Sequence, residues 1–217
     1  MFVLLKKEFT LELRRKSVLA GIVLYLISTT FICYLSFSLR LAPVSAPVWS
    51  ALLWIVVLFT VVNASAKSFI GEKAGSDIYM YSIASAESII LSKLIYNFLL
   101  SAFLSLSTFV LFTLFLDNPV QDLVVFFIAL LLGAGALASV LTTVSGIAAK
   151  ANNSNVLMAV LGFPVVVAVI LPVVKITRSA IDGLDWSVSQ PELIILVAIN
   201  CLIAAVSYLL FPYIWRS

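Results

Sequence analysis

The segment from Lys67 to Lys93, KSFIGEKAGSDIYMYSIASAESIILSK, contains the residues best suited to bind a partner protein. It combines charged and aromatic side chains with glycines that punctuate the chain. Docking is predicted to rest on five of its residues: Glu72, Gly75, Asp77, Tyr79 and Tyr81. Exposed tyrosines often become hot spots in protein interfaces. A short helix here would transmit force from a separate motor, whereas a plain loop would only rest its aromatic rings on lipid headgroups. The residues alone leave both readings open.

The sequence lacks the residues and motifs on which most enzymes depend. It contains no histidine, the side chain that most often serves as general base, metal ligand or haem ligand. It has no G-x-x-x-x-G-K-[ST] phosphate loop, no G-x-S-x-G elbow, no HExxH helix and no CxxC pair. Cys33 and Cys201 stand singly in apolar runs, where cysteine usually packs. We expect a non-catalytic chain that binds no metal and no cofactor of its own, and that has no nucleic-acid partner.

Composition places the chain in a membrane. It is 63% hydrophobic and 11% charged, where a soluble domain has about 25% charged residues. Each of its six uncharged stretches reaches the ~20 residues that a membrane-spanning helix needs. These stretches are Ser17 to Leu39, Leu41 to Ala66, Leu94 to Leu116, Leu123 to Ala149, Ala151 to Val174 and Leu193 to Trp215. The sequence therefore predicts an all-α integral membrane protein with six transmembrane helices, folded as a single transmembrane domain over residues 1–217.

Small residues follow a period of four in the fourth predicted span. The set consists of Ala134, Ala138, Thr142 and Gly146, with Gly135 and Ser139 beside them. Small side chains at this spacing let two helix backbones approach closely. We interpret the set as a helix-packing face rather than a substrate groove.

Positive charge predicts the orientation of the chain. With a cytoplasmic N-terminus, 10 of the 13 basic residues lie on the cytoplasmic side. They are Lys6, Lys7, Arg14, Arg15, Lys16, Lys67, Lys73, Lys93, Lys150 and Arg216. The other side keeps Arg40, Lys175 and Arg178, in the connections Arg40 to Val48 and Lys175 to Glu192. The positive-inside rule then places both termini in the cytoplasm.

The first 16 residues, MFVLLKKEFTLELRRK, have an amphipathic pattern. Phe2, Leu5, Phe9 and Leu13 recur at spacings of three and four, as on one face of a helix. This pattern favours a helix on the cytoplasmic membrane surface over a basic flank that only fixes topology. Trp49 and Trp186 fall near predicted interfaces, where tryptophan is an aromatic anchor.

Several of these features resemble one known family. They are the basic start KKEFTLELRRK, the residues Phe69, Glu72, Gly75 and Ser76 leading to Lys93, and the run Gly135 to Val140. On these features, and on its total length, the chain resembles the haem exporter B protein (CcmB) family, the six-span permease of an ABC transporter of cytochrome c maturation. It departs from the family pattern at SIASAES, which replaces a proline-rich step in the long cytoplasmic segment.

The resemblance implies a set of partners and a location. The family's permease pairs with a CcmA-like ATPase subunit and a CcmC-like haem-handling membrane protein in the bacterial inner membrane. A second copy of the chain and membrane lipid are further expected partners. ATP would then bind the ATPase, and haem would be handled by the complex on its way to a periplasmic chaperone. Two alternatives stay open on the residues: a permease for a lipid, polysaccharide or drug, and a structural membrane scaffold.

Overall fold

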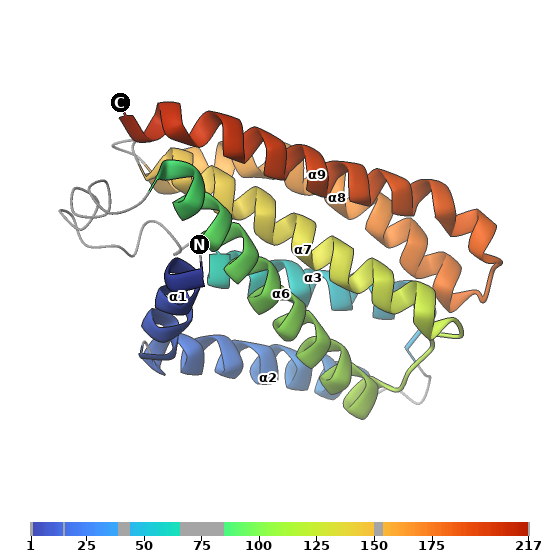
Figure 1. Ribbon diagram of the computed structural model, residues 1–217. Helices are drawn as coiled ribbons and strands as arrows, with labels where there is room; N and C mark the ends of the chain where they lie inside the picture. Colours follow the sequence, from blue (N-terminus) through green and yellow to red (C-terminus); the bar gives the residue numbers. More distant parts are fainter. Residues whose placement is uncertain (1, 15, 39–43, 66–84, 150–153, 217) are drawn as a thin grey trace.

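The computed structural model describes residues 2–14, 16–38, 44–65, 85–149 and 154–216 (Figure 1). This part of the chain is helical, without strands. Its helices are α1 (Phe2–Arg14), α2 (Lys16–Ser38), α3 (Ala46–Ser65), α6 (Ala86–Leu116), α7 (Leu123–Ala148), α8 (Ser154–Ile181) and α9 (Trp186–Arg216). All except α1 are long and apolar enough to cross a membrane, so the six-span, all-α prediction is confirmed.

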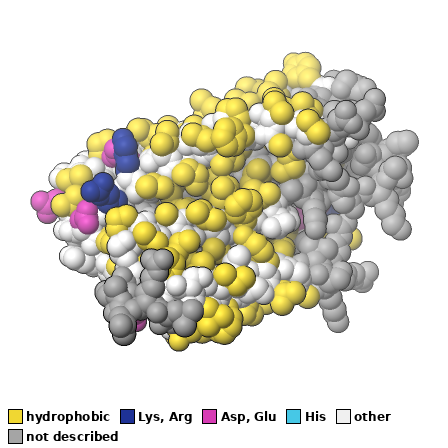
Figure 2. Space-filling model, turned by 180° about the vertical axis from the view of Figure 1, so that it is seen from behind, with side chains coloured by type: hydrophobic (Ala, Val, Ile, Leu, Met, Phe, Trp, Pro, Cys, Tyr) yellow, Lys and Arg dark blue, Asp and Glu magenta, His cyan; other side chains and the backbone are white. Residues whose placement is uncertain are grey.

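The long helices form an antiparallel bundle around α7. Helix α7 packs against α3, α6, α8 and α9, and 67% of its span is buried. By contrast, 22% of the α8 and α9 spans is buried, because these helices lie at the edge of the bundle (Figure 1). Figure 2 shows a flank covered largely by hydrophobic side chains, with Lys, Arg, Asp and Glu gathered at one end. The apolar flank matches the hydrocarbon region of a membrane.

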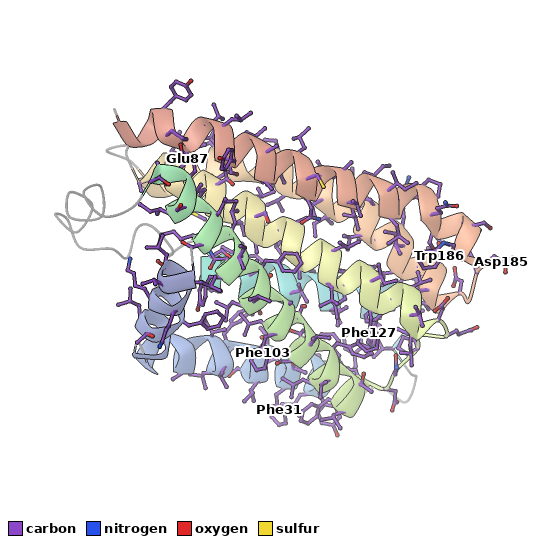
Figure 3. The ribbon with its side chains drawn as sticks, viewed as in Figure 1. Phe31, Glu87, Phe103, Phe127, Asp185 and Trp186 are labelled. Carbon is purple, nitrogen blue, oxygen red and sulfur yellow. The ribbon has the colours of Figure 1, made fainter. Side chains whose placement is uncertain are left out.

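The two ends of the bundle differ in what they contain. One end holds α1, the start of α6 and the end of α9, while the opposite end holds the α6–α7 and α8–α9 connections (Figure 1). Figure 3 shows Glu87 at the first end and Asp185 with Trp186 at the second. We call these the α1 end and the Asp185 end. The predicted cytoplasmic side corresponds to the α1 end, and this orientation stays a prediction.

Three predicted helix boundaries are wrong: the end of α8, the start of α9 and the start of α6. The connection predicted from Lys175 to Glu192 is much shorter, because α8 continues to Ile181 and α9 begins at Trp186. Lys175 and Glu192 lie inside these helices and form an ion pair of 3.7 Å. Likewise α6 begins at Ala86, well before Lys93. Charge ends an uncharged run in the sequence but does not interrupt the backbone hydrogen bonds of a helix.

Aromatic side chains fill the core near the Asp185 end. Trp49, in the first turn of α3, lies edge-on to Phe109 and Phe112, with ring centroids 6.3 and 5.8 Å apart. Its indole Nε1 donates a hydrogen bond to the backbone oxygen of Asp117, at 3.0 Å. Trp49 is only 1% exposed, so its predicted role in an interfacial belt is wrong. The carbonyl of Asp117 satisfies the indole N–H that a belt residue would offer to water.

Hydrogen bonds also fix the α6–α7 connection. Asp122 caps α7, because its carboxylate accepts the backbone N–H groups of Val124 and Val125. The backbone N–H groups of Gln121 and Asp122 both donate to the carbonyl oxygen of Ala180, in the last turn of α8. The connection is therefore bonded to the end of α8 as well as to Trp49 of α3.

Candidate functional site

Helix α1 lies across the α1 end of the bundle, transverse to the spans (Figure 1). The helix that the amphipathic pattern predicts is present over Phe2–Arg14. It packs against α6 and α2. Val3 points away from the protein and is exposed, whereas Glu8 is buried. The direction of α1 suits a helix on a membrane surface, and that location stays a prediction.

A buried ion pair joins α1 to α6. The ammonium Nζ of Lys93 lies 3.4 Å from the carboxylate Oε2 of Glu8, and Lys7 lies 3.5 Å from the other oxygen of the same carboxylate. Lys93 is completely buried and Glu8 is 9% exposed. A charge in such a place is tolerated when it is paired, since isolated burial of an ion is very costly.

The ion pair corrects the sequence analysis, which placed Lys93 in a cytoplasmic connection. Lys93 instead lies about two turns inside α6, with its charge matched by a residue 85 positions earlier in the chain. One signal for this pair was present in the sequence. Glu8 lies four residues after Leu4 and three after Leu5, which puts it at the edge of the apolar stripe rather than opposite to it.

Apolar contacts surround the ion pair. The rings of Phe9 and Tyr96 meet edge to face, with centroids 5.0 Å apart and planes at 87°. Leu4 packs against a cluster formed by Ile89, Ile90 and Leu94 of α6 and Phe211 of α9. We call Leu4, Glu8, Phe9, Lys93 and Tyr96 the α1–α6 junction. Hydrophobic contact and charge together fix α1 on the first turns of α6.

The start of α6 has the features of a well-formed helix N-terminus. The hydroxyl of Ser85 accepts the backbone N–H of Ser88 at 3.4 Å, and Glu87 lies in the first turn. A carboxylate there is favourable because the N-terminal end of a helix carries partial positive charge. Helix α6 thus begins two residues after the segment 66–84, and its first junction residue, Lys93, lies nine residues after that segment. The predicted docking residues Glu72, Gly75, Asp77, Tyr79 and Tyr81 lie in that segment, outside the described part of the chain.

The small residues of the fourth span lie in the contact between α7 and its neighbours. Ala134, Gly135, Ala138, Ser139, Thr142 and Gly146 are all buried. A Cβ atom at Gly135 would overlap the ring of Phe98 on α6. Thr142 accepts a hydrogen bond of 2.8 Å from the side-chain amide of Asn97 and donates one of 2.6 Å to the carbonyl oxygen of Ala138. Close backbone approach and a polar cross-link thus occur together.

A polar stripe that the sequence analysis did not recognise runs along α6. Its members are buried and recur at a helical spacing of three or four residues: Lys93, Asn97, Ser101, Ser105 and Thr108. Ser101, Ser105 and Thr108 donate to carbonyl oxygens of their own helix. These bonds satisfy the hydroxyls without a ligand. The four-residue period was the available signal, but uncharged polar residues do not interrupt an apolar run.

The contacts of this site hold helices together. Among the described residues, no group of three or more histidine, cysteine, aspartate or glutamate side chains could hold a metal ion. At the α1–α6 junction the Glu8 carboxylate is shared by two ammonium groups, that of Lys7 on one oxygen and that of Lys93 on the other.

Comparison with known proteins adds evidence independent of this geometry. The sequence model of the family described as CcmB protein matches residues 1–214 of the chain. None of the curated proteins matches it. The family match covers α1 and all six spans, so it includes the α1–α6 junction.

Proposed function

The chain belongs to the CcmB family, and on this premise we propose that it is the permease subunit through which a separate ATPase drives haem export. CcmB proteins are haem exporter permease components of the cytochrome c maturation system, and they are generally non-catalytic. The chain is accordingly a multi-pass membrane component of a Ccm haem export complex. We propose that a separate ATPase subunit supplies the energy and that it docks on this chain.

The α1–α6 junction is the observation that supports coupling. A motor that moved residues 66–84 would act directly on the first turns of α6, since α6 begins at Ala86. Those turns are fixed to α1 by the buried pair of Lys93 and Glu8. Removing one partner of a buried ion pair costs about 3–5 kcal/mol, so the two helices should move as one body. The junction thereby passes a local movement to a second helix.

The proposed complex contains the partners that the resemblance implies. A CcmA-like ATPase binds ATP and docks on Glu72, Gly75, Asp77, Tyr79 and Tyr81. A CcmC-like membrane protein handles haem, and this chain supplies an apolar wall or an ATP-driven change of shape. The exposed apolar flanks of α8 and α9 offer area for membrane lipid, for a second copy of the chain or for the CcmC-like protein. The complex lies in the bacterial inner membrane.

Docking is tested by co-purification of the CcmA-like ATPase with Tyr79→Ala and Tyr81→Ala variants. Each substitution should weaken ATPase recovery, because truncating a hot-spot tyrosine costs ~2 kcal/mol or more. Tyr208→Ala is the matched control: Tyr208 is exposed on the flank of α9, within its candidate span. Membrane insertion should be unchanged in all three variants. Wild-type ATPase recovery with both Tyr79→Ala and Tyr81→Ala would contradict docking at these tyrosines and would move it to α1 or to the segment around Lys150.

Coupling itself needs a second measurement. The ATPase should hydrolyse ATP faster when it is reconstituted with the chain and its CcmC-like partner than when it is alone. A rate that the chain does not change would favour a structural scaffold. A rate stimulated by a lipid, polysaccharide or drug, but not by haem, would favour a permease for another cargo.

A further inference from the structure

A small cavity lies at the Asp185 end, between the first turns of α3 and the last turns of α8. Its volume is about 270 Å³. Ala51, Val174 and Ile181 contribute apolar wall, and Ser50, Arg178 and Asp182 contribute polar groups. The cavity therefore combines an apolar lining with a few polar groups, the composition typical of ligand sites.

Ser50 is the unusual member of this lining. The residue is 5% exposed, and its hydroxyl Oγ is buried without a hydrogen-bond partner among the described residues. The buried serines Ser92 and Ser101 donate to carbonyl oxygens of their own helix. Thr113 and Ser189 lack a partner among the described residues, as Ser50 does, but they do not line this cavity. Most buried polar atoms have a partner, so an orphaned hydroxyl beside a cavity indicates a missing acceptor or donor.

Two opposite charges lie at the cavity. Arg178 Nε is 3.7 Å from the Oδ2 atom of Asp182, one helical turn away. Their side chains are 79% and 49% exposed, so both can bind further groups. A guanidinium suits phosphate, to which it can offer two parallel N–H groups, while a carboxylate suits an ammonium. Together they match a ligand whose head carries both charges and has no net charge.

The apolar side chains beside the cavity indicate that the ligand also has an apolar part. Leu171 and Val174 of α8 are exposed apolar side chains. Val174 lines the cavity and Leu171 lies one helical turn before it, on a span that a membrane would surround. A ligand that reaches the cavity from this flank would have acyl chains against these side chains and a head at the end of the helices. A soluble zwitterion would leave the flank uncovered.

We propose that this cavity binds the head of a zwitterionic phospholipid of the phosphatidylethanolamine class. Arg178 holds the phosphate, Asp182 holds the ammonium, and the Ser50 hydroxyl donates to a phosphate or ester oxygen. The acyl chains run along Val174 and Leu171. This site lies at the opposite end of the bundle from the α1–α6 junction, so it stands independently of the proposed ATPase coupling.

Lipid binding by the full chain in detergent micelles, measured by native mass spectrometry, tests the proposal. The wild-type chain should retain phosphatidylethanolamine in preference to phosphatidylglycerol by about threefold to tenfold, as one partly exposed charge-assisted contact allows. Arg178→Gln should lower phosphatidylethanolamine retention to a similar degree. Ala51→Leu, which extends an exposed side chain at the cavity and leaves its charges intact, should do the same. Lys175→Gln, on the same helix but outside the lining, should bind as the wild type does.

Two further measurements separate this ligand from its alternatives. Asp182→Asn should remove the preference for phosphatidylethanolamine over phosphatidylglycerol, because only the ammonium contact is lost. Phosphoethanolamine without acyl chains should fail to displace the lipid at equal concentration. Equal retention of the two lipids by the wild-type chain, or retention that neither Arg178→Gln nor Ala51→Leu changes, would overturn the proposal. Displacement by phosphoethanolamine would assign the site to a soluble zwitterion instead.

Discussion

Lys93 shows how strongly a single charged residue can bind two helices together. Its ammonium is completely buried and lies 3.4 Å from the Glu8 carboxylate of another helix. Replacing both charges by neutral side chains often has little cost, whereas leaving one charge alone in a buried place is strongly destabilising. The pair is therefore more sensitive to single substitutions than to a matched double substitution.

Lys93→Ala should lower the free energy of unfolding by up to about 3–5 kcal/mol, since it removes the completely buried partner of Glu8 and leaves only the half-buried Lys7 beside that carboxylate. The midpoint of thermal unfolding in detergent measures this loss. The double variant Glu8→Gln with Lys93→Met should recover most of it. Lys175→Ala is the control, because the Lys175 side chain is 70% exposed and its pair with Glu192 is worth at most about 1 kcal/mol. Equal shifts for Lys93→Ala and Lys175→Ala would contradict a structural role for the buried pair.

Residue roles at this scale were the hardest to predict from the sequence. The sequence predicts both Lys93 and Trp49 at the membrane boundary, because Lys93 precedes the uncharged run that begins at Leu94 and Trp49 follows the predicted connection that ends at Val48. Their actual partners are 85 and 68 positions away, at Glu8 and at the carbonyl of Asp117. A local pattern shows that a polar group is present, but only the packed bundle determines which distant group satisfies it.

At the scale of elements, the contact between α6 and α7 depends on the absence of a side chain at Gly135. A Cβ atom there would overlap the ring of Phe98, so the ring or the helix would have to move. Gly135→Ala should therefore destabilise the protein by about 1–3 kcal/mol, as overpacking does. The same thermal unfolding measurement applies.

Gly162→Ala is the matched control for this substitution. Gly162 lies inside α8, and the nearest atom to its added Cβ, Leu141 Cδ2, would be 3.9 Å away. Alanine should be neutral there, or stabilising by up to about 1 kcal/mol through helix propensity. Equal destabilisation by the two substitutions would show that Gly135 has no special role in the contact.

The elements themselves were largely predictable, because a helix in hydrocarbon must keep apolar side chains along its whole length. The ends of the helices were not predictable from the uncharged runs. Helix α6 begins before Lys93, and α8 ends after Lys175. The period of α1 predicted its helix correctly. The face of α1 that is buried, with Leu4 and Glu8, lies beside the predicted stripe of Phe2, Leu5, Phe9 and Leu13. Amphipathicity cannot indicate where a neighbouring helix will cover that surface.

For the whole molecule, the distribution of charge predicts that both termini are cytoplasmic. Reporter fusions after Leu116 and after Ser217 should report periplasm and cytoplasm, respectively. Basic residues retained on the cytoplasmic side during insertion are the physical reason. The reverse pattern would place the α1–α6 junction on the wrong side of the membrane for any cytoplasmic ATPase.

The whole chain should also not ligate haem strongly on its own. It has no histidine, and Cys33 and Cys201 lie on different helices, α2 and α9. Methionine usually serves beside a histidine rather than in its place. The visible spectrum of the chain purified without partners should therefore lack a sharp, stoichiometric Soret band. A band that disappears in Cys201→Ser or in a tyrosine variant would make this chain a haem carrier itself.

The pair of Glu8 and Lys93 also sets an order of events during synthesis. A ribosome that adds about 5–20 residues per second needs on the order of 4–17 s to cover the 85 residues between them. During that interval α2 and α3 are synthesised, and the carboxylate of Glu8 does not yet have the ammonium of Lys93 as a partner. Helix α1 can take its final position only after α6 has been synthesised. Docking of α1 therefore indicates that α6 is in place.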